Sequence, residues 1–170
     1  ATETPANDDP DARKELTNLV GVPWTIQSQR QFDRALVIID AGIAFWNDRF
    51  RGAQGPRFRG MRYLDFEQPF FGLTKGLNDL EIEGLCTRAN DEGNRAMVNH
   101  LGGRFPNSVF GKAANPNPEG FWHGTAVADL AAGATPGEAD NVALFGIELP
   151  RSVVADYSGE QLRHVLAALL

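Results

Sequence analysis

Residues 35–43 read ALVIIDAGI, an apolar run that closes at Asp40 and is followed by Gly42. Because apolar and polar residues do not alternate in it, the run predicts a strand buried on both faces, as in a parallel sheet. Residues 142–147, VALFGI, have the same character and predict a second such strand. Between them an apolar face at helical spacing predicts a helix, with the face formed by Val127, Leu130, Ala131 and Ala134. We therefore expect an α/β fold with a mostly parallel sheet and helices on both faces.

The composition limits the classes of function. A chain of 170 residues fits one domain or a large part of one. Its net charge of -6 disfavours nucleic acid as a partner. No stretch of 18 apolar residues is present, so no membrane partner is expected, and the first residues lack the pattern of a signal peptide. The compartment stays unknown, and the single cysteine, Cys86, is expected to pack as a small apolar residue.

The chain divides into an N-terminal arm with a short helix, residues 1–33, and a main domain, residues 34–170. The main domain carries a long insertion at 46–121, rich in Gly, Asn, Phe and Arg. Within the insertion we expect an edge strand at 79–83, a short helix within 91–101 and a loop at 111–120. Its basic cluster is expected to be a solvated loop, and consists of Arg49, Arg51, Arg57, Arg59 and Arg62.

The last residues predict a helix that begins near Ser158 and has no stop signal before Leu170. We therefore expect the natural polypeptide, or a partner segment, to continue the fold past this point.

Two short motifs carry the candidate chemistry. Residues 121–128 read FWHGTAVA, and His123 stands just before the predicted helix, with Gly124 leaving the approach to the ring open. Acyl transfer by a serine needs an imidazole that accepts the hydroxyl proton and later returns it to the leaving group. It also needs a carboxylate that orients the imidazole, and Asp40 at a strand end is suited to that role. Each motif alone has other interpretations, because the histidine could simply pack near a helix start and Asp40 could cap a helix.

Together the two motifs resemble those of the subtilisin-like serine peptidases. Residues 39–43, IDAGI, match the family's I-D-x-G-I, and residues 123–128, HGTAVA, match its H-G-T-x-V-A, in the same order. The resemblance covers residues 34–48 and 120–170. It implies an Asp-His-Ser triad in which Asp40 orients the base and His123 moves the proton. Asp40 and His123 are 83 positions apart, which exceeds the usual spacing, and residues 46–121 hold the excess.

The third motif of that family is absent from the sequence. None of the four serines stands in a G-T-S-x-A context; they are Ser28, Ser108, Ser152 and Ser158. The family's oxyanion-hole asparagine is also missing. The expected function is therefore a serine endopeptidase, a hydrolase, whose Asp and His lie here. Its serine would lie in a C-terminal peptidase fragment or a second chain, and its substrate would be a peptide or protein.

Two other functions are compatible with these residues. The chain could be a catalytically inactive binding or regulatory chain on a peptidase-like scaffold. It could also be a nucleotide-binding module in which Asp40 holds a ribose, although no G-x-G-x-x-G precedes it.

No cofactor is required by these motifs. The histidines and Cys86 lack zinc-site spacing, and no metal ligand is assigned. Calcium is left open, because the resembling family often binds it through loop oxygens, but no EF-hand-type loop is present. Three acidic residues could instead face an ion, a basic substrate or solvent; they are Asp79, Glu81 and Glu83.

Overall fold

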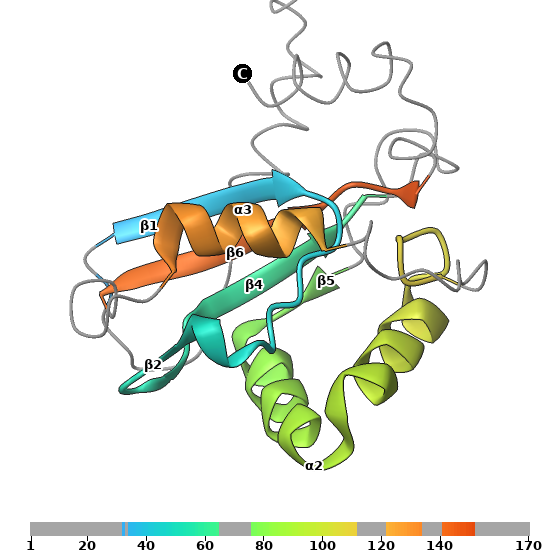
Figure 1. Ribbon diagram of the computed structural model, residues 1–170, viewed down its shortest axis with the longest axis horizontal. Helices are drawn as coiled ribbons and strands as arrows, with labels where there is room; N and C mark the ends of the chain where they lie inside the picture. The colour runs from blue at the N-terminus through green and yellow to red at the C-terminus, as the bar shows by residue number, and fades with distance from the viewer. Residues whose placement is uncertain (1–31, 33, 65–75, 112–121, 134–140, 152–170) are drawn as a thin grey trace, which may run out of the picture.

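The computed structural model describes residues 32, 34–64, 76–111, 122–133 and 141–151. These residues form an α/β fold with a four-stranded mixed sheet in the order β1-β6-β4-β5 (Figure 1). The strands of this sheet are β1 (Arg34–Asp40), β6 (Val142–Glu148), β4 (Phe58–Tyr63) and β5 (Gly76–Leu77). A small hairpin of β2 (Arg51–Gly52) and β3 (Gly55–Pro56) follows the 3-10 helix η2 (Asp48–Phe50). Two α-helices complete the described fold, α2 (Asp79–Arg104) and α3 (His123–Ala132).

Both predicted strands are present and are direct neighbours, but only β6 is buried as predicted: β1 stands at the end of the strand order of the described sheet, and its Val37 is 40% exposed. β1 pairs with β6 in parallel, in a register that ends with Asp40 opposite Glu148. β4 pairs in parallel with the other side of β6, and β5 adds an antiparallel edge strand. Figure 1 shows the arrowheads of β1 and β6 at the same end of the sheet. The carboxyl ends of these strands therefore bring residues 40 and 148 together, although more than a hundred positions separate them in the chain.

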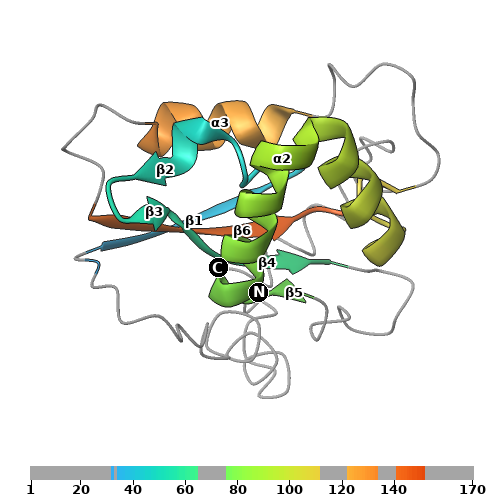
Figure 2. The same cartoon turned by 90° about the horizontal axis from the view of Figure 1, so that it is seen from below.

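The helix predicted after His123 is confirmed as α3, but its predicted apolar face is only partly right. Val127 packs against the core while Ala131 is exposed, and Ala134 lies outside the described residues. Gly124 and Ala128 are its buried residues, whereas Leu130 is 89% exposed. The reason is that α3 lies close against β1, and at that separation glycine and alanine fit where larger side chains do not. Figure 2, a view turned by 90°, shows α3 along one side of the sheet.

The predicted edge strand at 79–83 is wrong, because these residues form the first turn of α2. Asn78 accepts a hydrogen bond from the amide of Glu81, and the Glu81 side chain accepts one from the amide of Asn78. This capping box starts a helix, and acidic residues in a first turn favour one further. Ile82, Leu85 and Cys86 then form the buried face at helical spacing, so the alternation of acidic and apolar residues was misleading.

The helix predicted within 91–101 is confirmed as the second arm of α2, in which Met97 and Leu101 are fully buried. The two arms meet at a kink at Gly93, where φ is 80°. Glycine adopts this left-handed conformation without the steric cost that other residues incur.

The basic cluster is not a solvated loop as a whole. Arg57 and Arg59 are each 1% exposed, because β4 lies within the sheet next to β6. The Arg59 guanidinium forms a 3.0 Å ion pair with Asp79, whose side chain is also buried. An Nη of Arg57 donates to the carbonyl of Ala132 at the end of α3 at 2.6 Å. Residues 46–121 thus contribute the strands β4 and β5, as well as buried charges, to the main sheet.

The α/β class is established, but helices on both faces are not shown by the described part of the chain. There α3 lies along one face, and α2 lies beyond the β4–β5 edge (Figures 1 and 2). The expected helices of the N-terminal arm and of residues 158–169 lie outside the described residues, as does the loop at 112–120. Among the described residues, no helix has both the length and the apolar character needed to span a membrane.

Candidate active site

The turn that follows β1 is fastened to the neighbouring strand. Gly42 has a φ of 74°, a left-handed conformation that turns the chain sharply away from the strand end. Its amide donates to one carboxyl oxygen of Glu148 at 2.6 Å, and the amide of Ile43 donates to the other at 3.2 Å. Glu148 is 1% exposed, so its carboxyl group fills the space behind the turn. The carbonyl of Asp40 in turn accepts from the amide of Leu149 at 2.8 Å.

The first turn of α3 is bonded to the same segment. The amides of Gly124 and Thr125 donate to the carbonyls of Ala41 and Gly42 at 2.7 and 3.1 Å. The hydroxyl of Thr125 also donates to the carbonyl of Gly42 at 2.6 Å and accepts from the amide of Ala44 at 2.8 Å. Helix starts leave amides without partners inside the helix, and here the turn after β1 satisfies two of them. The start of α3 is therefore held by at least four hydrogen bonds across the Asp40 turn.

Gly124 permits this close approach, which is a different role from the one predicted. A Cβ at position 124 would lie 2.7 Å from both the carbonyl oxygen of Ala41 and a side-chain carbon of Ile43. It would also lie 3.1 Å from the Cβ of Asp40. Gly124 is thus required by its contact with the strand end, rather than by access to the ring of His123.

Aromatic side chains fix the other side of the helix start. The ring centroid of Trp122 lies 6.3 Å from that of Trp46 and 5.9 Å from that of Phe110. Trp46 also makes an edge-to-face contact with Phe45, at 5.1 Å. These contacts anchor the residue before His123, so the backbone that carries the imidazole is supported on both sides.

The two residues predicted to form the site, Asp40 and His123, are in contact. The Nδ1 atom of His123 lies 2.9 Å from each carboxyl oxygen of Asp40. A carboxylate only accepts hydrogen bonds, so Nδ1 is the donor in this contact, and in the neutral ring Nε2 then holds the free lone pair. The side chain of Asp40 is 18% exposed and that of His123 is 73% exposed. The carboxylate is therefore largely enclosed while the ring presents its free edge to solvent. We refer to Asp40 and His123 as the dyad.

Glu148 is a second acid at the same strand ends. Its burial raises its pKa to about 8; the amide hydrogen bonds of Gly42 and Ile43 oppose the shift, and the charge of Asp40 adds to it. Tyr63, opposite Glu148 on β4, is also buried, and burial followed by the charge of Glu148 raises the pKa of its hydroxyl. At neutral pH the carboxyl group of Glu148 therefore favours its protonated form.

Sequence reasoning missed the contributions of Glu148 and Thr125. The signal for Glu148 was present, since an ionisable residue inside the apolar run 142–149 has to find a buried partner. Nothing in the sequence showed that its partners are the amides of Gly42 and Ile43. Thr125 stood inside the H-G-T motif, but its bonds to Gly42 and Ala44 depend on how α3 approaches β1.

The described residues do not supply a nucleophile next to the dyad. Ser108 is 3% exposed, and its hydroxyl donates to the carbonyl of Phe105 at 2.7 Å. The other three serines lie outside the described residues. Within the described part of the chain no group of three His, Cys, Asp or Glu side chains is placed to hold a metal ion. The suggestion of calcium therefore gains no support from these residues.

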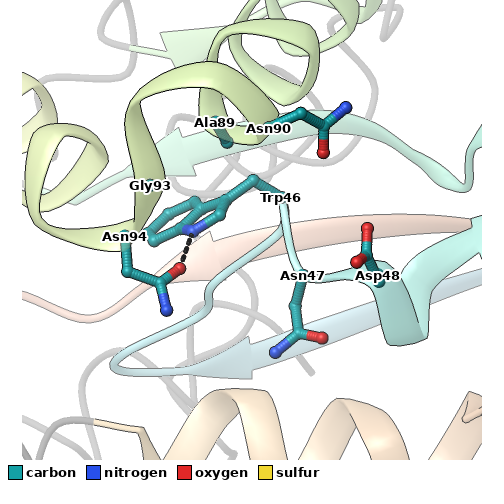
Figure 3. Close-up of a pocket in the computed structure, with 7 residues that line it drawn as sticks. All are labelled: Trp46, Asn47, Asp48, Ala89, Asn90, Gly93 and Asn94. Carbon is teal, nitrogen blue, oxygen red and sulfur yellow. Dashed lines mark hydrogen bonds between the residues drawn. The ribbon is translucent and has the colours of Figure 1, made fainter.

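A cavity of about 370 Å³ lies away from the dyad, between the segment after β1 and the kink of α2 (Figure 3). Figure 3 shows asparagine and aspartate side chains around it, with the indole nitrogen of Trp46 donating to Asn94 at 2.7 Å. The lining residues are Trp46, Asn47, Asp48, Ala89, Asn90, Gly93 and Asn94. They include neither Asp40 nor His123, so the cavity is not the site of the predicted chemistry.

No family model matches the chain, and neither the curated proteins nor the solved structures provide a match. Any assignment of activity consequently depends on the motifs and on the geometry of the dyad.

Proposed function

We propose that this chain supplies the acid-base half of a serine endopeptidase of the subtilisin-like type. The observation that carries the proposal is the 2.9 Å contact of the His123 Nδ1 atom with both carboxyl oxygens of Asp40. The contact joins the two motifs that suggested the family, across 83 residues of chain, and it leaves the Nε2 edge of the ring facing outward.

In the proposed mechanism the Nε2 atom of His123 accepts the proton of a serine hydroxyl as that oxygen attacks the substrate carbonyl. Asp40 keeps the ring in the tautomer with the proton on Nδ1 and stabilises the imidazolium that forms. His123 then returns the proton to the leaving amine, and a water molecule repeats the sequence to release the acyl group. The burial of Asp40 supports this role, since an enclosed carboxylate interacts more strongly with the imidazolium than one in water.

The serine and the oxyanion donors belong to the partner in this proposal, which is a C-terminal peptidase fragment or a second chain. The substrate is a peptide or protein whose scissile carbonyl lies between that serine and His123. Oxyanion donors typically contribute 10²- to 10³-fold, about 3–4 kcal/mol, so the chain without its partner should have negligible turnover.

The test is to label the native preparation with a fluorophosphonate and to measure the intact mass of every polypeptide in it. Label on a serine-bearing polypeptide that co-purifies with the 170-residue chain is the expected result. A single unlabelled species of 18.5 kDa, with no turnover, would contradict the proposal and favour a binding or regulatory chain.

Two variants of the completed enzyme test the dyad directly. Asp40→Asn should lower kcat by about 10⁴-fold, because an amide at this position favours the wrong tautomer of His123. His123→Ala should be at least as severe. The matched controls are Asp129→Asn, which changes a half-buried aspartate paired with the exposed Arg49, and His100→Ala. Near wild-type turnover in either dyad variant would refute the assignment.

A further inference from the structure

We propose that Glu148 is a positioning residue of the dyad. Its carboxyl group holds the turn after β1, and that turn holds the first turn of α3, so that His123 stays against Asp40. The inference rests on the proposed function for its catalytic meaning, but the physical link can be measured without any turnover.

The link is a continuous path of hydrogen bonds. It begins at the carboxyl oxygens of Glu148, which accept from the amides of Gly42 and Ile43 at 2.6 and 3.2 Å. It continues from the carbonyl of Gly42, which accepts from both the amide and the hydroxyl of Thr125. Thr125 follows His123 by two residues in the same helical turn. Each end of the dyad is therefore attached to the short segment that Glu148 fixes.

In the described part of the chain, the side chain of Glu148 makes no other hydrogen bond or ion pair that would explain a buried acid at this position. A buried acid is unfavourable unless its carboxyl group is hydrogen-bonded, and an apolar residue would suit the β6 core better. No ion pair to Glu148 exists among the described residues. The groups that face Glu148 are Asp40 on β1 and Tyr63 on β4. The charge of Arg104 on α2 opposes the rise in the pKa of Tyr63. In the described part of the chain, the hydrogen bonds of the Glu148 side chain are those from the two amides of the turn.

The Gly42 turn needs such an acceptor. The amides of residues 42 and 43 point together at the end of the sheet, where no further strand residue accepts from them. Two adjacent amides are satisfied by the two oxygens of one carboxyl group, which a leucine of similar size cannot provide. Without the acceptor the turn is free to rotate, and a displacement of about 1 Å at a reacting group can lower a rate by about 10²-fold.

The experiment compares Glu148→Gln and Glu148→Leu in the full chain, with Glu92→Gln as the matched control. Glu92 is an exposed glutamate that pairs with Arg88 on the surface of α2. Nitrogen-edited NMR spectra of the histidine side chains report the proton on Nδ1 of His123, and the amide spectra report Gly42 and Ile43. Both are recorded from pH 5 to pH 9.5, and circular dichroism confirms that each variant is folded.

In the wild type we expect a protected Nδ1 proton and a step near pH 8 in the amide shifts of Gly42 and Ile43, where Glu148 ionises. Glu148→Gln keeps an acceptor for Gly42, so it should keep the protected proton and lose the step. Glu148→Leu should increase the exchange rate of the Nδ1 proton by about tenfold or more. Glu92→Gln should match the wild type in every respect.

The proposal is overturned if folded Glu148→Leu retains the wild-type exchange rate, or if the step near pH 8 persists in Glu148→Gln. Should the leucine variant not fold, the glutamine variant alone decides. In the completed enzyme, Glu148→Leu should lower kcat by about 10²-fold with KM unchanged. Intact NMR signals in a preparation that never shows turnover would contradict the peptidase proposal and leave the positioning role of Glu148 supported.

Discussion

Replacing Gly124 by alanine tests whether the close approach of α3 to β1 creates the dyad. The new Cβ would lie 2.7 Å from the carbonyl oxygen of Ala41, where ordinary contacts begin at 3.4 Å. The helix start must therefore retreat by about 0.7 Å, the difference between these two distances. Neither neighbour can move aside easily, because one is backbone and the other is the buried side chain of Ile43.

The expected cost follows from these contacts. Overpacking of this kind costs about 1–3 kcal/mol, and the hydrogen bond from the Gly124 amide to Ala41 weakens by about 1 kcal/mol. The better helix propensity of alanine offsets up to about 1 kcal/mol. Gly124→Ala should thus be destabilised by about 1–3 kcal/mol in chemical unfolding. If His123 moves with the backbone, its 2.9 Å contact with Asp40 lengthens to about 3.6 Å, which is no longer a hydrogen bond.

The matched control is Gly84→Ala in the first arm of α2, where a Cβ would meet nothing within 4 Å. That change should stabilise the protein by about 0.5–1 kcal/mol, so the two variants should differ in sign. The assays are urea unfolding and the exchange rate of the His123 Nδ1 proton. A Gly124→Ala protein that is as stable as Gly84→Ala and keeps the protected proton would refute the reasoning.

Three further predictions concern buried charged and polar groups. Asp79→Asn should destabilise the protein by up to about 3–5 kcal/mol, because it removes the buried carboxylate 3.0 Å from the Arg59 guanidinium, which keeps its 3.3 Å ion pair with Glu83. Asp129→Asn breaks a more exposed ion pair with Arg49 and should cost less than about 1 kcal/mol, and equal costs would contradict the burial argument. Cys86 should resist alkylation at pH 8 in the folded chain, because burial raises the pKa of its thiol to about 12; rapid labelling in mass spectrometry would show that it is accessible. Glu148 should make the free energy of unfolding decrease as pH rises from about 4.5 to about 8, because the folded state retains a proton that the unfolded state has lost. Urea unfolding at each pH measures this profile, and Glu148→Gln should flatten it over the same range. An identical slope in the variant would show that another group is responsible.

The parts of the fold that sequence predicted correctly have strong local signals. The apolar runs at 35–39 and 142–147 predicted strands, and they form β1 and β6, which are neighbours in the sheet although β1 is partly exposed. Asp40 and His123 were found because their motifs specify a strand end and a helix start. Where two local patterns competed, the prediction was wrong: residues 79–83 alternate like a strand, yet the capping box of Asn78 and Glu81 starts a helix.

The sequence alone therefore determined the α/β class, the neighbouring strands β1 and β6, the helix after His123 and the identity of the dyad. Only the tertiary structure decided which face of α3 is buried, why residue 124 is a glycine and what the acid at position 148 does. These depend on the separation of α3 from β1 and on the register that sets Asp40 opposite Glu148. Local sequence patterns report which side chains prefer to be buried, whereas separation and register arise only when distant segments pack together.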